Sequence, residues 1–171
     1  MTYYNLVAST DEVTVVAEYT PEYRVKGQTY QSEAALEQSF IHQLESQGYE
    51  YIRIANEASM IENIRRQLEK LNDYTFTDGE WERFFNESLA NANEGIVEKT
   101  RKIQEDHIQN LRLDNGTTKN IYLLDKNNIH NNRLQVINQY EEDSGRRATR
   151  YDVAILVNGL PLIHVELKRR G

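Results

Sequence analysis

The chain lacks cysteine, has only two prolines, and contains no long apolar run among its 171 residues. Without cysteine it can form neither a disulfide framework nor a cysteine-based zinc site, and its four histidines include no pair at zinc-ligand spacing. No window reaches the roughly 18 apolar residues that a membrane helix needs. The N-terminus also lacks the basic region and apolar stretch of a secretory signal. We therefore expect a cytoplasmic protein that does not enter a membrane.

Negative charge dominates the chain, but it is distributed unevenly. The net charge of −7 argues against nonspecific nucleic-acid binding, because contacts to phosphates need clustered lysine and arginine. Residues 144–171 nevertheless carry +4, which leaves −11 for the rest of the chain. The bases at this end are Arg146, Arg147, Arg150, Lys168, Arg169 and Arg170. They either form a solvated charged end or position phosphates beside a site in this segment.

The length and the absence of a linker favour one domain. The chain is long enough to bury a core without disulfide or metal support. It contains no internal repeat, no low-complexity tract and no stretch rich in proline, glycine and serine. We therefore interpret residues 1–171 as a single α/β (or α+β) domain. The abrupt end at Gly171 leads us to expect that the sequence is part of a longer protein.

Helices are predicted before most of the sheet. Ser32 is a suitable N-cap, and apolar residues at helical spacing predict a helix from there to a stop at Gly48. Thr77 and Glu80 stand at the spacing of a capping box. Three further helices are expected, over 59–72, 77–89 and 94–113. We expect Trp81 and its aromatic neighbours to pack in the core rather than to stack on bases.

Alternating apolar residues predict strands. Two short strands are expected near the start of the chain, over 13–19 and 23–27. Four more are expected after Asn120, over 120–125, 132–142, 149–157 and 161–168. Asn158 and Gly159, between the last two, are a strong hairpin signal. Together these elements predict a mixed β-sheet flanked by helices.

The last two predicted strands each have one apolar face. The apolar residues on this face are Val153, Ile155, Val157, Ile163, Val165 and Leu167. The other face carries charged residues, Asp152 in the first strand and Glu166 and Lys168 in the second. Three charged residues in segments that otherwise read as buried sheet indicate either a functional site or a solvated edge.

The register of this hairpin decides whether the two acids meet. A regular two-residue turn pairs Val157 with Leu160, which sets Asp152 opposite Val165 and turns Glu166 to the other face. A three-residue loop, or one bulge, instead puts Asp152 directly across from Glu166. We expect this second register because it keeps the six apolar residues on one buried face.

Two carboxylates at cross-strand distance repel one another, and a sheet face partly covered by helices desolvates them. A divalent cation with oxygen ligands would compensate, and Mg²⁺ characteristically takes one or two carboxylates besides water and substrate phosphate. Lys168 would then orient or deprotonate the attacking water, or stabilise negative charge in the transition state. The alternative is that Asp152, Glu166 and Lys168 form the salt-bridged solvent face of an ordinary strand pair.

These residues resemble the core of the PD-(D/E)xK nucleases as it occurs in the R (restriction, motor) subunit of type I restriction-modification enzymes. The resemblance rests on Asp152, the turn Asn158-Gly159-Leu160-Pro161, and Glu166-Leu167-Lys168. It continues through segments such as "SEAALEQSFIHQLESQGYEY", "FTDGEWERF" and "LLDKNNIHNNRLQVINQY". It implies a restriction-endonuclease-like fold and a hydrolase, an endonuclease dependent on Mg²⁺ or Mn²⁺ that cuts double-stranded DNA.

The resemblance also implies roles for individual residues. Asp152 and Glu166 correspond to metal ligands, the Leu167 carbonyl is a further candidate ligand, and Lys168 corresponds to the catalytic lysine. By the same resemblance Arg146, Arg147, Arg150, Arg169 and Arg170 are candidates for binding DNA. Tyr151 stands where the name of the motif has proline, a substitution that touches no ligand.

The family fold also places an acid on the early helix, where this sequence offers Glu33 and Glu37. A helical wheel puts both within the apolar arc of that helix. For Glu33 the position in the first turn has its own explanation, because an acid there interacts favourably with the helix dipole. Glu37 has no such explanation, and we favour it as a catalytic residue.

The resemblance implies a larger enzyme around this domain. No phosphate-binding loop occurs in the sequence, and "DNGTTKN" is a turn, so ATP binding and DNA translocation would belong to motor domains that are missing here. The implied partners are double-stranded DNA and the specificity and modification (methyltransferase) subunits. Residues 1–171 alone are expected to cleave poorly. The alternative function is a noncatalytic docking domain with a nuclease-like fold that contacts the motor or the methyltransferase core.

Overall fold

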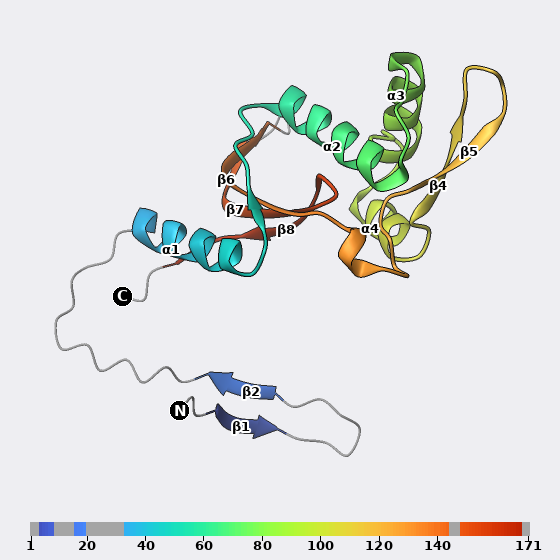
Figure 1. Ribbon diagram of the computed structural model, residues 1–171. Coiled ribbons are helices and arrows are strands. Elements are labelled where there is room, and N and C mark those ends of the chain that lie inside the picture. The colour runs from blue at the N-terminus through green and yellow to red at the C-terminus, as the bar shows by residue number, and fades with distance from the viewer. Residues whose placement is uncertain (1–3, 9–15, 20–32, 144–147, 169–171) are drawn as a thin grey trace. The chain divides into compact units, whose positions relative to one another are not determined.

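The computed structural model describes residues 4–8, 16–19, 33–143 and 148–168 (Figure 1). The chain forms two compact units, Met1–Gln31 and Ser32–Gly171. In the first unit, β1 (Tyr4–Ala8) and β2 (Val16–Tyr19) form an antiparallel pair. Strand β2 agrees with the strand predicted over 13–19, whereas β1 was not predicted. The strand expected over 23–27 lies outside the described residues.

The second unit contains the remaining described elements. In chain order these are α1 (Glu33–Ser46), β3 (Glu50–Tyr51), α2 (Glu57–Asn72), α3 (Asp78–Phe84), the π-helical segment η1 (Phe85–Leu89), α4 (Ile96–Gln104), β4 (Ile108–Arg112), β5 (Thr118–Tyr122), the 3-10 turn η2 (Ile129–Asn131), β6 (Leu134–Asp143), β7 (Ala148–Val157) and β8 (Leu160–Val165). No helix in the described ranges combines the length and the apolar character needed to cross a membrane.

A mixed four-stranded sheet forms the centre of this unit, in the order β3-β6-β7-β8. Strand β3 is parallel to β6, whereas β6, β7 and β8 are antiparallel neighbours. Helices α1 and α2 lie on opposite sides of the sheet (Figure 1). The predicted fold class, a mixed α/β sheet flanked by helices, is confirmed.

The second half of β7, residues 153–156, is buried on both faces, which explains its continuous apolar sequence. On the α1 side, Val153 and Ile155 pack with Ile41 of the helix. On the α2 side, Ala154 and Leu156 belong to a second cluster, which includes residues of α2 and of the following helices. Two hydrophobic layers therefore hold β7 in place at the middle of the unit.

The first three predicted helices are confirmed. Helix α1 ends before Gly48, which has a φ of +93° that glycine adopts more readily than other residues. Helix α3 begins with the predicted capping box: Thr77 accepts a hydrogen bond from the Glu80 N–H, and the Glu80 side chain accepts one from the Thr77 N–H. Trp81 is buried against Phe76 and Phe84, as expected for a packing residue.

The predicted helix over 94–113 is wrong in its second half. Helix α4 ends at Gln104, and Ile108–Arg112 forms β4, which pairs with β5 across a turn containing Gly116 (φ +84°). This pairing buries Leu111 and Ile121 almost completely against the main core. Burial in the tertiary structure outweighs the local helical tendency of the segment.

The turn between β7 and β8 packs tightly against α2. Asn158 and Gly159 both have positive φ, +51° and +81°, as a two-residue hairpin turn requires. A Cβ on Gly159 would lie 2.8 Å from the Cα of Ile64, so this position also needs glycine for space. The fully buried Asn158 side chain accepts a hydrogen bond from the Arg133 N–H and donates one to the Leu123 carbonyl.

Candidate active site

The register of β7 and β8 contains the expected irregularity. The turn itself is regular, because Val157 pairs with Leu160 across two residues, and the three-residue loop does not form. Beyond it the register shifts by one, and Leu162 is the unpaired residue between the partners of Ile155 and Leu156. The prediction of a bulge is therefore confirmed.

The bulge produces the register in which the two acids would face each other. Beyond it Val153 pairs with Val165, so continuing the same register sets Asp152 opposite Glu166. The structure thus brings together the end of β8 and the part of β7 that carries Asp152.

Strand β8 ends at Val165, not at Lys168 as predicted. Beyond the end of β8, the backbone N–H of Leu167 donates a hydrogen bond of 2.7 Å to a side-chain oxygen, Oδ2 of Asp152. The half-buried Asp152 carboxylate therefore takes the place of a strand carbonyl and holds the segment after β8 against β7.

Glu166 and Lys168 lie side by side and face solvent. Lys168 Nζ is 3.4 Å from Oε1 of Glu166, and the two side chains are 78% and 68% exposed, respectively. The expectation that both carboxylates are desolvated is wrong for Glu166, because β8 is an edge strand and ends before it. Likewise, Ile163 on the predicted buried face is 50% exposed. An exposed pair of this kind contributes little to stability.

Glu37 is buried in α1, at 7% exposure, whereas Glu33 is exposed. Oε1 of Glu37 accepts a hydrogen bond of 2.5 Å from Nδ2 of Asn138, whose Oδ1 accepts one of 2.7 Å from the Tyr51 hydroxyl. Asn138 pairs with Val153, the neighbour of Asp152, so Glu37 lies beside this part of the sheet on its α1 face.

The described ranges contain no group of three histidine, cysteine or acidic residues that could hold a metal ion. The structure therefore places Lys168 beside Glu166 and the Leu167 N–H on Asp152, and in the described ranges no third acid joins them. Two carboxylates and a backbone carbonyl still form the hard oxygen donor set that Mg²⁺ and Mn²⁺ accept. A carboxylate has several lone pairs, so the contact of Asp152 with Leu167 leaves it able to bind a cation.

Most of the candidate DNA-binding arginines cannot be placed. Arg146, Arg147, Arg169 and Arg170 lie outside the described residues. The backbone of Arg150 belongs to β7, opposite Glu141.

Asn138 and Tyr51 were missed by reasoning from sequence. The available signal was a polar Asn138 two residues after Val136 of β6, a position that shares its face with this core residue. Tyr51 gave no signal, because its contact with Asn138 joins residues far apart in the chain.

Comparison with known proteins identifies the family of the chain. Residues 30–171 match the family described as the type I restriction enzyme R protein N terminus, and the chain belongs to this family. It is 43% identical over 166 residues to the type I restriction enzyme EcoprrI endonuclease subunit of Escherichia coli, a match that covers 96% of this chain and 52% of that protein. The resemblance seen in the sequence is confirmed.

More distant relatives are much longer. The chain is 40% identical over 147 residues to the type I restriction enzyme SsaAORF53P endonuclease subunit of Staphylococcus saprophyticus subsp. saprophyticus. This match covers 83% of this chain and 15% of that protein. The chain therefore spans about half the length of the Escherichia coli relative and a smaller part of the staphylococcal one.

Proposed function

We propose that the second unit is the metal-dependent endonuclease domain of a type I restriction R subunit, and that it hydrolyses phosphodiester bonds of double-stranded DNA. The observation that carries the proposal is the bulge at Leu162. It shifts the register so that Val153 pairs with Val165, and in this register the next residues, Asp152 and Glu166, would face each other. A regular hairpin would turn the two acids to opposite faces.

Asp152 and Glu166, with the Leu167 carbonyl, would hold one Mg²⁺ or Mn²⁺. When bound, this ion supplies a Lewis acid for the phosphate and lowers the pKa of water. The hydrogen bond from the Leu167 N–H fixes the Asp152 carboxylate, so that ligand is oriented before DNA binds.

Lys168 would act on the attacking water or on the phosphate. Its ammonium group lies 3.4 Å from Glu166, so the glutamate can hold the lysine beside the proposed cation. From there Lys168 can orient the water, or donate hydrogen bonds to the charge that develops on the phosphate oxygens.

We also propose Glu37 as the acid that the family resemblance implies on the early helix. The support is its burial and its contact with Asn138, which pairs with Val153, the neighbour of Asp152. By strand alternation the Asp152 side chain starts from the other face of β7, so Glu37 would act on the site from the α1 side. In this arrangement Asn138 positions the Glu37 carboxylate.

The wider assembly is also a proposal. The names of the chain's relatives describe endonuclease subunits of type I restriction enzymes. We propose that ATP-driven translocation by the remainder of such a subunit delivers DNA to this site in the cytoplasm. Specificity and modification subunits would supply target recognition, and Arg146, Arg147, Arg150, Arg169 and Arg170 would contact phosphates.

A noncatalytic docking domain is the second candidate. The observation that favours it is the exposure of Glu166 and Lys168, which matches an ordinary solvated ion pair. A docking domain needs no cation at Asp152, whereas a nuclease does.

Calorimetric titration with Mn²⁺ therefore separates the two candidates. We expect wild-type protein to bind Mn²⁺ and Asp152→Asn to bind it at least about tenfold more weakly, because the substitution removes one of two ligand charges. Asp106→Asn, which removes an exposed carboxylate elsewhere, should bind like wild type. Equal binding by Asp152→Asn and wild type would favour the docking domain.

A further inference from the structure

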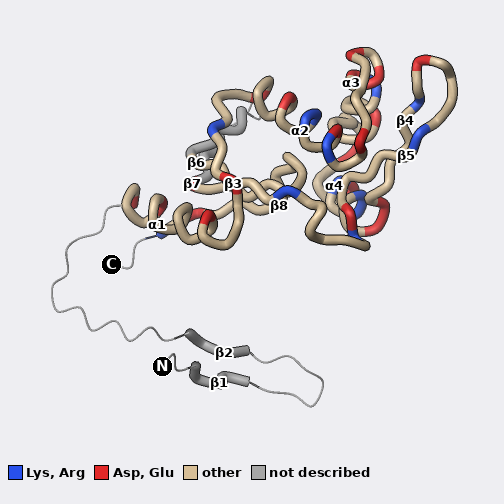
Figure 2. Tube along the Cα trace, in the orientation of Figure 1, with Lys and Arg blue, Asp and Glu red and all other residues tan. Residues whose placement is uncertain are grey.

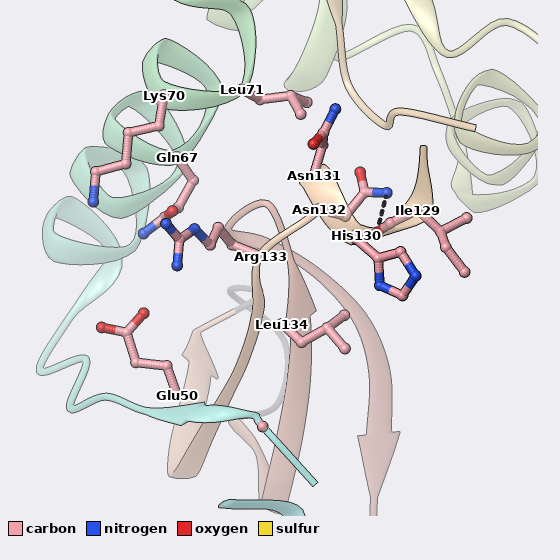
Figure 3. Close-up of a pocket in the computed structure, with 11 residues that line it drawn as sticks. Glu50, Gln67, Lys70, Leu71, Ile129, His130, Asn131, Asn132, Arg133 and Leu134 are labelled. Atoms are coloured by element: carbon pink, nitrogen blue, oxygen red, sulfur yellow. Dashed lines mark hydrogen bonds between the residues drawn. The ribbon is translucent and has the colours of Figure 1, made fainter. Parts of the chain in front are cut away.

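A pocket of about 630 Å³ lies at the other end of the sheet (Figure 3). It is lined by the last turns of α2, by Glu50 of β3 and by the segment that leads from η2 into β6. Leu134, in its lining, pairs with Val157 at the far end of β7. Asp152 is five residues earlier on that strand, roughly 17 Å away. The pocket is therefore separate from the proposed nuclease site.

The pocket is cationic in a chain whose net charge is −7. Lys70 and Arg133 line it, and neither forms an ion pair within the described part of the chain. Along α3 and α4, by contrast, basic and acidic residues lie close together (Figure 2). Glu50 is the acid in the lining, and it accepts a hydrogen bond from Gln135. Two bases and one acid favour an anionic group in the ligand.

Gln67 adds a requirement for a hydrogen-bond donor. Its side chain lines the pocket at 2% exposure, and Oε1 has no hydrogen-bond partner among the described residues. In Figure 3 the Gln67 and Arg133 side chains point toward one another. Gln67 Oε1 is buried in this structure, so a ligand N–H reaches it only if a neighbouring side chain moves. Arg133 is exposed and forms no ion pair in the described part of the chain, so it is free to turn toward an anion. A DNA backbone carries no such donor, whereas a peptide backbone does.

Two apolar residues complete the lining. Ile129 is 68% exposed and Leu134 is 36% exposed, so an aliphatic side chain can pack on both. The pocket thus combines a cationic part, one unpaired acceptor and an apolar rim.

We propose that this pocket binds an acidic peptide segment of a partner protein. A backbone N–H of the peptide pairs with Gln67, and a carboxylate of the peptide lies between Lys70 and Arg133. An aliphatic side chain next to it packs on Ile129 and Leu134. This interaction is independent of cleavage at Asp152 and adds a docking site to the domain.

A blocked peptide of alternating glutamate and leucine tests the proposal by calorimetric titration. We expect it to bind the wild-type chain and to bind Arg133→Gln and Gln67→Met about tenfold more weakly, because each loses one charged or polar contact. Lys99→Gln removes an exposed lysine from α4 and should bind like wild type. A peptide of alternating lysine and leucine should not bind.

Three results would overturn the proposal. The first is that the acidic peptide does not bind. The second is that Lys99→Gln weakens binding of the peptide as much as Arg133→Gln does. The third is that a short DNA duplex displaces the peptide from the pocket. Arg133 is exposed, so its variant remains informative even if Gln67→Met proves unstable.

Discussion

Gly159 is the residue at which the hairpin depends most directly on the absence of a side chain. Its φ is positive and the backbone of α2 leaves no room for a Cβ, whereas Gly116 has a similar φ with nothing within 4 Å. The two glycines therefore separate the effect of backbone conformation from the effect of packing.

We expect Gly159→Ala to lower the free energy of unfolding by about 2–4 kcal/mol, since it combines positive-φ strain with overpacking against α2. Gly116→Ala should lower it by only about 1 kcal/mol. Urea denaturation of the two variants measures the difference. Equal losses would show that the approach to Ile64 has no energetic consequence.

Glu80 is a buried acid, 3% exposed, whose role is structural. Burial acts to raise its pKa, but hydrogen bonds from the Thr77 N–H, the Tyr74 hydroxyl and the Asp114 N–H outweigh it and leave the pKa below 4.5. A depressed pKa means that ionised Glu80 stabilises the fold above its unfolded-state pKa. This contribution is lost as pH falls through the folded-state value.

Glu80→Gln should therefore be less stable than wild type at pH 7, and the difference should shrink as pH falls below about 4.5. Urea denaturation between pH 7 and pH 3 measures it. Glu82→Gln, on the exposed side of the same helix, should not show this change. A difference between Glu80→Gln and wild type that stays constant with pH would contradict the assignment.

At the scale of elements, α1 is joined to the sheet by the contacts of Glu37, Asn138 and Tyr51. Glutamine at position 37 keeps a carbonyl oxygen for the Asn138 amide but removes the charge. We expect Glu37→Gln to fold normally and to reduce plasmid cleavage by the assembled enzyme about 10–100-fold. Cleavage at the wild-type rate would make Glu37 a structural residue only.

Tyr51→Phe is the control for this network. It removes one hydroxyl and should lower the free energy of unfolding by about 1 kcal/mol, while the charge of Glu37 remains. If Tyr51→Phe abolished cleavage as well, the effect of Glu37→Gln could not be assigned to its carboxylate.

The elements show what could be predicted from sequence. Capping residues and apolar spacing identified α1, α2 and α3, because these signals are local. Strand β4 was missed because its helical pattern yields to pairing with β5, a nonlocal contact. The bulge was expected from the positions of apolar residues, but its place at Leu162 depends on how β8 packs beside the turn.

The site could be predicted less completely than the fold. The family motif indicated Asp152, Glu166 and Lys168. The helical wheel put both Glu33 and Glu37 in the apolar arc, but only Glu37 is buried. The exposure of Glu166 was not foreseen, because it depends on where β8 ends and which strand lies at the edge. Gln67 and Arg133 were also missed, since they come from segments far apart in the sequence.

Considered as a whole, the chain belongs to the family described as the type I restriction enzyme R protein N terminus, and its relatives are named as endonuclease subunits. The two ends of its central sheet differ. One end brings together two acids and a lysine, and the other holds a cationic pocket. On this account, cleavage and docking belong to separate ends of one sheet and can be disabled separately.

Plasmid cleavage by the full-length subunit, assembled with its partner subunits, compares wild type with Lys168→Ala and tests the nuclease site. We expect Lys168→Ala to lose cleavage but still to hydrolyse ATP, while Lys99→Ala, which removes an exposed lysine of α4, retains both activities. Cleavage by Lys168→Ala at the wild-type rate would contradict the assignment of a nuclease site to Asp152, Glu166 and Lys168.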